Sequence, residues 1–132
     1  MKSLVSLRLV AVLHAVAVCL QPVLAGVYLN GSGSAMRLHE PLGLGLAFVC
    51  LGLVLVATIY WRAGGRARAV LVALLLLAAE SFQIAMGYNR QLALHIPLGI
   101  TIVAIACALA VWTFRPAARV RRTRKRAAEV LA

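Results

Sequence analysis

The chain has 132 residues, of which 64% are hydrophobic and 13% charged, with a formal net charge of +11. Soluble domains are closer to half apolar and about a quarter charged, so this composition excludes an ordinary soluble domain and indicates an integral membrane protein. The length supports one domain. Because the positive charge flanks apolar segments, we expect it to fix topology and meet membrane lipid, with no nucleic acid as a partner.

Four apolar segments are long enough to cross a hydrocarbon layer of ~30 Å, which needs ~20 residues of helix. They lie at about 8–29, 41–61, 68–88 and 94–114. Their short connections predict antiparallel packing of sequential helices. The expected fold is an all-α integral membrane protein, an up-down bundle of four transmembrane helices made of two tandem helix pairs. Residues 1–114 would form one four-helix transmembrane domain, and 115–132 a basic cytoplasmic tail.

The first segment also fits a signal peptide, because residues 1–25 combine a basic start, an apolar run and the small-residue site Val23-Leu24-Ala25. We retain it as a helix, since the third segment would otherwise lack a partner. Basic residues flank this segment, separate the second from the third and follow the fourth, whereas the other side carries only Arg37 and Arg90. Both termini are therefore expected in the cytoplasm, in a plasma membrane of the bacterial type.

Two ionisable residues, His14 and Glu80, lie within the first and third segments. A charge at the bilayer centre costs at least ~2.5–3.5 kcal/mol on insertion scales, so an intramembrane carboxyl group normally faces protein and has a partner. We expect His14 and Glu80 to form a hydrogen bond and a candidate proton or quinol site. The alternative is a protonated Glu80 that bonds a backbone carbonyl or Gln83.

A six-residue motif is repeated at the start of the second and fourth segments. LHEPLG at 38–43 and LHIPLG at 94–99 agree at five of six positions, and a looser echo relates 21–26 to 83–87. Helices two and four lie diagonally in an up-down bundle, so His39 and His95 are expected to face each other near the outer surface. Pro41 and Pro97 are expected in the first helical turn, where the missing N–H costs nothing.

The matched histidines predict haem ligation, because two neutral imidazoles can hold one iron from opposite sides. Gly43 and Gly99 lie at i+4 from them, where the missing side chains would leave a flat space for the macrocycle or permit close helix packing. Arg37 and Arg90 are candidate partners for the haem propionates, since a guanidinium matches a carboxylate. The alternatives are that the histidines are interfacial polar residues and that Arg37 pairs with Glu40.

The counts of histidine and cysteine limit the cofactors. With three histidines in the chain, one bis-histidine haem b is the expectation. The three cysteines, Cys19, Cys50 and Cys107, lie inside the spans without a CxxC motif. They are interpreted as small packing residues rather than as disulfide partners or metal ligands.

The stretches LQPVLAGVYLNGSG (20–33), RLHEPLGLGL (37–46) and FQIAMGYNRQLALHIPLGITI (82–102), with the closing VW at 111–112, resemble one four-helix half of haem A synthase. The resemblance implies that His39 and His95 are the haem ligands. The family's catalytic half has a glutamate where this chain has Met36, and a cysteine pair in the first outer loop that 30–40 lacks. Oxidation of a haem methyl group is therefore doubtful, and whether the chain is an enzyme stays open.

These inferences predict a b-type membrane cytochrome that holds one haem near the extracytoplasmic face and passes single electrons. The redox partner would be a soluble protein or a quinone. A homodimer would restore the eight helices of the family. Two alternatives stay open: a small proton-coupled transporter centred on Glu80, and a cofactor-free accessory subunit of a larger membrane complex.

Overall fold

The computed structural model describes residues 2–119, and these form helices and turns. The long helices are α1 (Lys2–Leu29), α2 (Gly33–Arg62), α3 (Arg68–Tyr88) and α4 (Leu92–Phe114), followed by the single turn α5 (Pro116–Arg119). Each of the four long helices is apolar and long enough to cross a membrane. The predicted four-helix membrane bundle is therefore confirmed. Of the predicted basic tail, residues 120–132 lie outside the described range.

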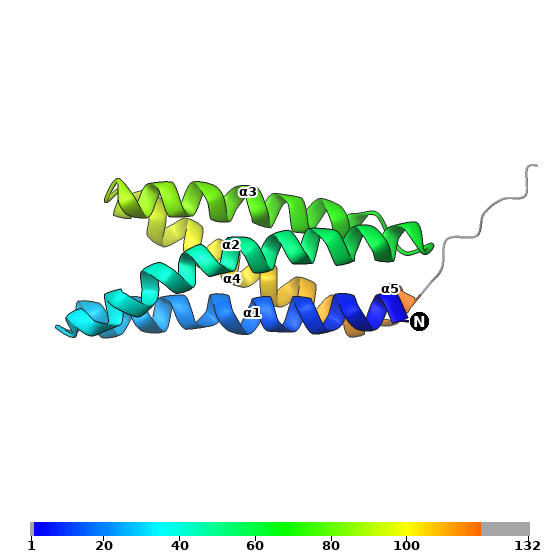
Figure 1. The fold of residues 1–132 in the computed structure, drawn as a ribbon, viewed down its shortest axis with the longest axis horizontal. Helices are drawn as coiled ribbons and strands as arrows, with labels where there is room; N and C mark the ends of the chain where they lie inside the picture. Colours follow the sequence, from blue (N-terminus) through cyan, green and yellow to red (C-terminus); the bar gives the residue numbers. More distant parts are fainter. Residues whose placement is uncertain (1, 120–132) are drawn as a thin grey trace, which may run out of the picture.

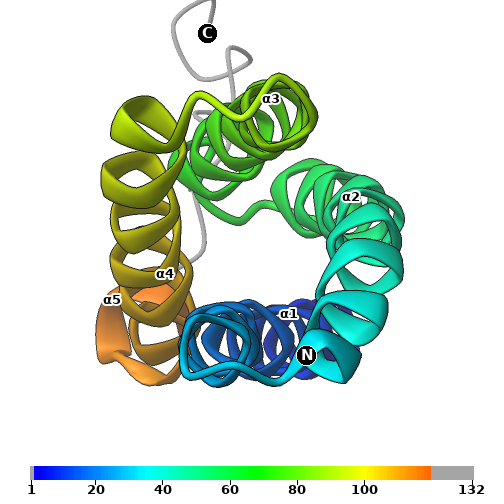
Figure 2. The same ribbon diagram turned by 90° about the vertical axis from the view of Figure 1, so that its left-hand side faces the viewer.

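The four helices run up and down and occupy the corners of a square when viewed along the bundle (Figure 2). α1 packs against α2 and α4, and α3 packs against the same two helices. α1 and α3 therefore lie on one diagonal and α2 and α4 on the other, as short connections require. The N-terminus, the α2–α3 turn and α5 lie at one end (Figure 1), which we call the basic end. The α1–α2 and α3–α4 turns lie at the opposite end, the histidine end.

Many of the side chains buried between the helices are small, and many large apolar side chains point outward, although Leu7, Leu53 and Leu76 are fully buried. Lipid is as apolar as leucine, so close backbone approach rather than hydrophobic burial favours helix association in a membrane. Accordingly, leucine, valine, isoleucine and phenylalanine side chains are exposed along all four helices. The buried alanines of the four helices are Ala11, Ala15, Ala35, Ala57, Ala69, Ala73, Ala106 and Ala110.

The second helix begins earlier than predicted. α2 starts at Gly33, and the connection that was expected over residues 30–40 is reduced to the turn between α1 and α2. Pro41 therefore lies inside α2 and Pro97 inside α4, so their predicted placement in a first turn is wrong. A proline inside a helix removes one backbone hydrogen bond. Membrane helices tolerate this loss because neighbouring groups satisfy the freed carbonyl.

All three turns between the long helices close with the same backbone hydrogen bond, which spans six residues. It runs from Ser32 N to Val27 O (3.2 Å), from Gly65 N to Tyr60 O (3.0 Å) and from Gln91 N to Met86 O (2.9 Å). This Schellman pattern places one residue in the left-handed region, which glycine occupies without strain. The residues are Gly31 (φ 98°), Gly64 (φ 96°) and Arg90 (φ 55°). The backbone of the α3–α4 turn is therefore strained, because its left-handed residue is an arginine and not a glycine.

Replacing Arg90 by glycine is therefore expected to stabilise the protein. A non-glycine residue in this conformation destabilises the folded state by ~1–2 kcal/mol. Glycine removes this strain, but its greater conformational freedom in the unfolded chain offsets part of the stabilisation. The expected gain in unfolding free energy is about 1 kcal/mol or less, measured by thermal unfolding in detergent. Gly64→Ala, the matched opposite change, should destabilise. A loss of stability in Arg90→Gly would contradict this reading of the turn.

At the basic end, side-chain hydrogen bonds join α1, α2 and the α2–α3 turn to the last turn of α4 and to α5. Arg8 Nε donates to Thr113 O (2.9 Å), and Tyr60 Oη donates to Ala118 O (2.9 Å). The Arg68 guanidinium lies 4.4 Å from the centre of the Trp112 ring, beside an apolar groove of about 230 Å³ between α3 and α4. These contacts fix the basic end and leave the histidine end as the place where the repeated motifs meet.

Candidate functional site

The repeated histidines meet near the histidine end of the bundle. His39 comes from α2 and His95 from α4, the two helices on one diagonal. Their ring centroids are 6.2 Å apart, and the ring planes are tilted by 55°. Both side chains are half-buried. The structure therefore brings together the two residues that the sequence predicted to face each other.

Each histidine is held by a glutamine of the preceding helix through two reciprocal hydrogen bonds. His39 Nδ1 donates to Gln21 O (3.2 Å), and Gln21 Nε2 donates to His39 O (3.3 Å). In the second helix pair, His95 Nδ1 donates to Gln83 O (2.9 Å), and Gln83 Nε2 donates to His95 O (2.7 Å). The tandem repeat in the sequence is thus a repeat of contacts as well.

These hydrogen bonds determine which ring nitrogen is available. A carbonyl oxygen only accepts hydrogen bonds, so Nδ1 carries the proton and Nε2 of the neutral ring keeps its lone pair. Within residues 2–119, neither His39 Nε2 nor His95 Nε2 has a hydrogen-bond partner. Histidines that bind metals usually donate their other N–H to a carbonyl or carboxylate in this way. Both rings therefore have the tautomer in which Nε2 can act as a ligand atom.

Glycines make room for the contacts around the histidines. A Cβ added at Gly99 would lie 2.8 Å from Gln83 Nε2, and one added at Gly43 would lie 3.7 Å from Gln21 Nε2. The sequence indicated space at these two positions, and the structure shows the glutamine amides there. At Gly87 an added Cβ would lie 3.0 Å from His95 Cε1. Gln21, Gln83 and Gly87 lie outside the repeated LHxPLG motif that predicts the site, although the echo between 21–26 and 83–87 contains all three.

The outer cations form no hydrogen bond or ion pair with the histidines among residues 2–119. Arg37 and Arg90 are exposed at the histidine end. Arg37 precedes His39 by two residues in one helix, and such side chains do not share a face. Glu40 accepts a hydrogen bond from Tyr88 Oη (2.7 Å), and no Arg37–Glu40 ion pair forms among the described residues. Both guanidinium groups are therefore free to meet an anionic group at this end.

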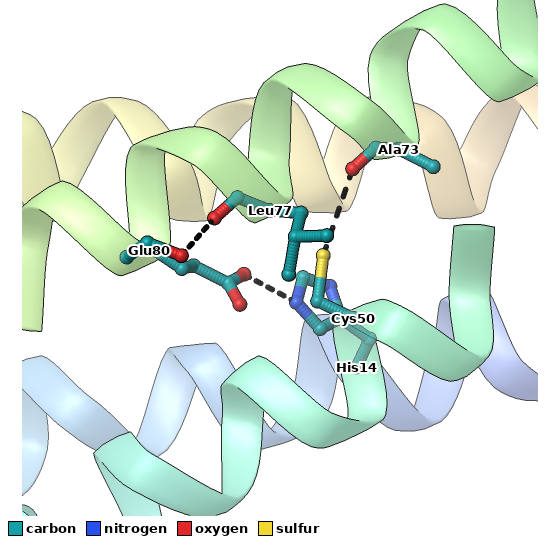
Figure 3. Close-up of polar contacts among 6 residues, drawn as sticks. His14, Cys50, Ala73, Leu77 and Glu80 are labelled. Atoms are coloured by element: carbon teal, nitrogen blue, oxygen red, sulfur yellow. Dashed lines mark hydrogen bonds and ion pairs between the residues drawn. The ribbon is translucent and has the colours of Figure 1, made fainter.

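A second polar cluster lies deeper in the bundle, on the other diagonal. His14 of α1 and Glu80 of α3 are buried, and His14 Nε2 lies 2.5 Å from Glu80 Oε1 (Figure 3). The predicted hydrogen bond is thus confirmed, whereas the alternative partners of Glu80 are not seen in the described part of the chain. Cys50 Sγ of α2 donates to Ala73 O (3.7 Å).

The ligand atoms of His14, Cys50 and Glu80 all lie within 4.8 Å of one another. They form a nitrogen, sulfur and oxygen set that could hold a metal ion, but the hydrogen bond between His14 and Glu80 already occupies two of the three groups. Cys50 cannot be recognised as a member of this cluster from the sequence, because a cysteine in an apolar span resembles a packing residue. Cys19 and Cys107 also resemble packing residues in the sequence, but the structure brings their free thiols together. Their sulfur atoms lie 3.7 Å apart.

Comparison with known proteins gives no match. No family model fits the chain, and no curated protein or solved structure is significantly similar to it. The resemblance to one half of haem A synthase therefore stays an expectation from the sequence motifs. The chemistry of the site has to be inferred from the geometry of its side chains.

Proposed function

We propose that the chain is a b-type membrane cytochrome that binds one haem b between His39 and His95. The observation that carries this proposal is the separation of the two rings. With metal–nitrogen bonds of about 2 Å on each side, two imidazoles that hold one ion have centroids roughly 6 Å apart. The His39 and His95 centroids are 6.2 Å apart, and each ring keeps Nε2 available.

The contacts of the two histidines favour electron transfer over chemistry at the iron. When bound, haem supplies a one-electron couple whose potential depends on axial ligands and burial. The carbonyls of Gln21 and Gln83 hold Nδ1–H and orient both rings, which also makes the ligand nitrogens more basic. Because two protein nitrogens would fill both axial positions, no position is left for a substrate. The residue at the position of the family's catalytic glutamate, Met36, cannot transfer protons.

The proposed orientation places the haem near the extracytoplasmic face. The basic residues Arg8, Arg62, Arg66, Arg68 and Arg115 are at the same end as the N-terminus, opposite the histidine end. By the positive-inside rule this end faces the cytoplasm of a bacterial-type cell. A soluble redox protein could then approach the histidine end from outside, or a quinone from the lipid. Arg37 and Arg90 are the candidate partners of the propionates, and Arg37 would have to reach them from a helix face other than that of His39. A homodimer would provide eight helices.

Haem titration of the purified protein tests this function. The expected result is saturation at one haem per chain and an oxidised-minus-reduced spectrum of the low-spin b type. Low-spin absorption follows from two nitrogen ligands, so it reports the geometry as well as binding. A protein that stays colourless when it is expressed and purified with ample haem would overturn the proposal and favour a cofactor-free role.

A further inference from the structure

Several buried polar atoms in the described part of the chain have no hydrogen-bond partner, and three of them belong to the His14–Glu80 pair and the neighbouring Gln83. They are His14 Nδ1, Glu80 Oε2 and Gln83 Oε1. Buried polar atoms nearly always have a hydrogen-bond partner, which is protein, water or an ion. His14 is 0% and Glu80 4% exposed, so these atoms cannot be satisfied by bulk solvent. Water or a proton is therefore the natural partner for the free positions of this cluster.

Two of the three unpartnered atoms belong to Glu80 and Gln83, which lie on the face of α3 that contacts His95. Glu80, Gln83 and Gly87 are spaced at i, i+3 and i+7, so they lie on one face of α3. Gln83 makes two hydrogen bonds to His95, and Gly87 lies against its ring. From Glu80 to Gly87 the helix rises roughly 10 Å. One face of α3 thus connects the buried His14–Glu80 pair with one of the proposed haem ligands.

The hydrogen-bonding capacity of Glu80 Oε2 and Gln83 Oε1 indicates what kind of partner can bridge them. Glu80 Oε2 as a carboxylate and Gln83 Oε1 as an amide oxygen only accept hydrogen bonds. Two acceptors can be joined by a proton on Glu80 or by a bridging water molecule that donates to both. In either case Glu80 is placed to gain or lose a proton next to the group that holds His95.

Few other ionisable groups face this pair. From α2 the thiol of Cys50 lies beside it, and the buried residues of α4 are Ile102, Ala106, Leu109, Ala110 and Thr113, none of which titrates. Arg8 of α1 is bonded to the Thr113 carbonyl at the basic end. No lysine or arginine is buried in the described part of the chain. If the charge in the bundle core changes, His14 and Glu80 are therefore the groups that can bind or release a proton in response. Cys50 is the one further group beside them that can titrate.

We propose that the His14–Glu80 pair binds one proton for each electron that arrives at the site between His39 and His95, an inference that rests on the proposed cytochrome function. The electron comes from a one-electron donor, a quinol or a reduced redox protein, and the proton comes from water through the polar atoms of the cluster. On oxidation the same proton leaves the pair. Added negative charge in a low-dielectric interior raises the proton affinity of a nearby carboxylate, so electron and proton binding favour each other.

The test is the pH dependence of the haem midpoint potential. In the unmodified protein we expect the potential to fall as pH rises, because proton binding then supports reduction less. Glu80→Gln should keep the low-spin haem spectrum and lose this dependence. Ser81→Ala, a neighbouring polar change on the exposed side of α3, should leave it intact, and Cys50→Ala distinguishes a thiol contribution. A pH-independent potential in the unmodified protein, or an unchanged dependence in Glu80→Gln, would overturn the proposal.

A second measurement covers the case in which Glu80→Gln fails to fold. Protons taken up on reduction of the unmodified protein are counted with a pH indicator in weakly buffered solution. Uptake of about one proton per electron is expected from the single pair, and no uptake would contradict it. Absence of haem from the unmodified protein would instead remove the proposed function itself. The two failures are thus distinguishable.

Discussion

His39→Ala and His95→Ala should each abolish the low-spin b-type spectrum. In the proposed cytochrome each ring would supply one of two nitrogen ligands, and because the rings come from different helix pairs neither could replace the other. Loss of a partner of a metal ligand already costs about 10–100-fold in affinity, and loss of the ligand itself should cost more. The measurement is haem titration of each variant with its difference spectrum.

External imidazole provides the matched control for these variants. The side chain removed by His39→Ala leaves a space of the shape of imidazole, so added imidazole should restore part of the low-spin absorption. His14→Gln, a change at the third histidine, should keep the spectrum. Persistence of the full spectrum in either His39→Ala or His95→Ala would contradict bis-histidine ligation.

Gly87→Ala and Gly99→Ala should weaken haem binding without unfolding the bundle. The new Cβ at Gly87 would lie 3.0 Å from His95 Cε1, and the one at Gly99 would lie 2.8 Å from Gln83 Nε2. Both distances are shorter than the optimum of about 3.5–4.0 Å between carbon atoms, so the His95 ring or its glutamine must move. A misplaced ligand ring should lower haem affinity by about tenfold or more. Haem titration and thermal unfolding of the same samples give the two quantities.

Helical glycines of the other two long helices, α1 and α2, give the control for these two changes. No atom lies within 4 Å of a Cβ added at Gly26 or Gly45. Alanine is favoured over glycine inside a helix by about 1 kcal/mol, so Gly26→Ala and Gly45→Ala should keep or raise stability and leave haem affinity unchanged. Equal haem affinity in all four variants would show that contacts at Gly87 and Gly99 do not position His95.

The helix bundle and both residue pairs could be predicted because the sequence marks them strongly. Apolar runs separated by arginines define four spans, and short turns then place α2 opposite α4 and α1 opposite α3. The repeated motif sets His39 and His95 at one depth. The cost of an intramembrane carboxyl group indicated a partner for Glu80, and His14 is that partner in the structure.

The contacts that orient the site could not be predicted in the same way. In a membrane helix both the lipid-facing and the protein-facing sides are apolar, so hydrophobic periodicity does not fix the rotation of the helix. Gln21 and Gln83 act on the histidines through backbone carbonyls, which every residue has, and Cys50 depends on the rotation of α2. The early start of α2 was missed because Pro41 suggested a first turn, whereas the backbone there is already helical.

The most direct test of the account is electron paramagnetic resonance of the oxidised, haem-loaded protein. Two histidine nitrogens on one ferric iron predict a low-spin signal with no high-spin component, and this signal should turn high-spin in His39→Ala and in His95→Ala. A high-spin signal in the unmodified protein would mean that at most one of the two rings binds the iron. The arrangement of His39 and His95 would then have a different function.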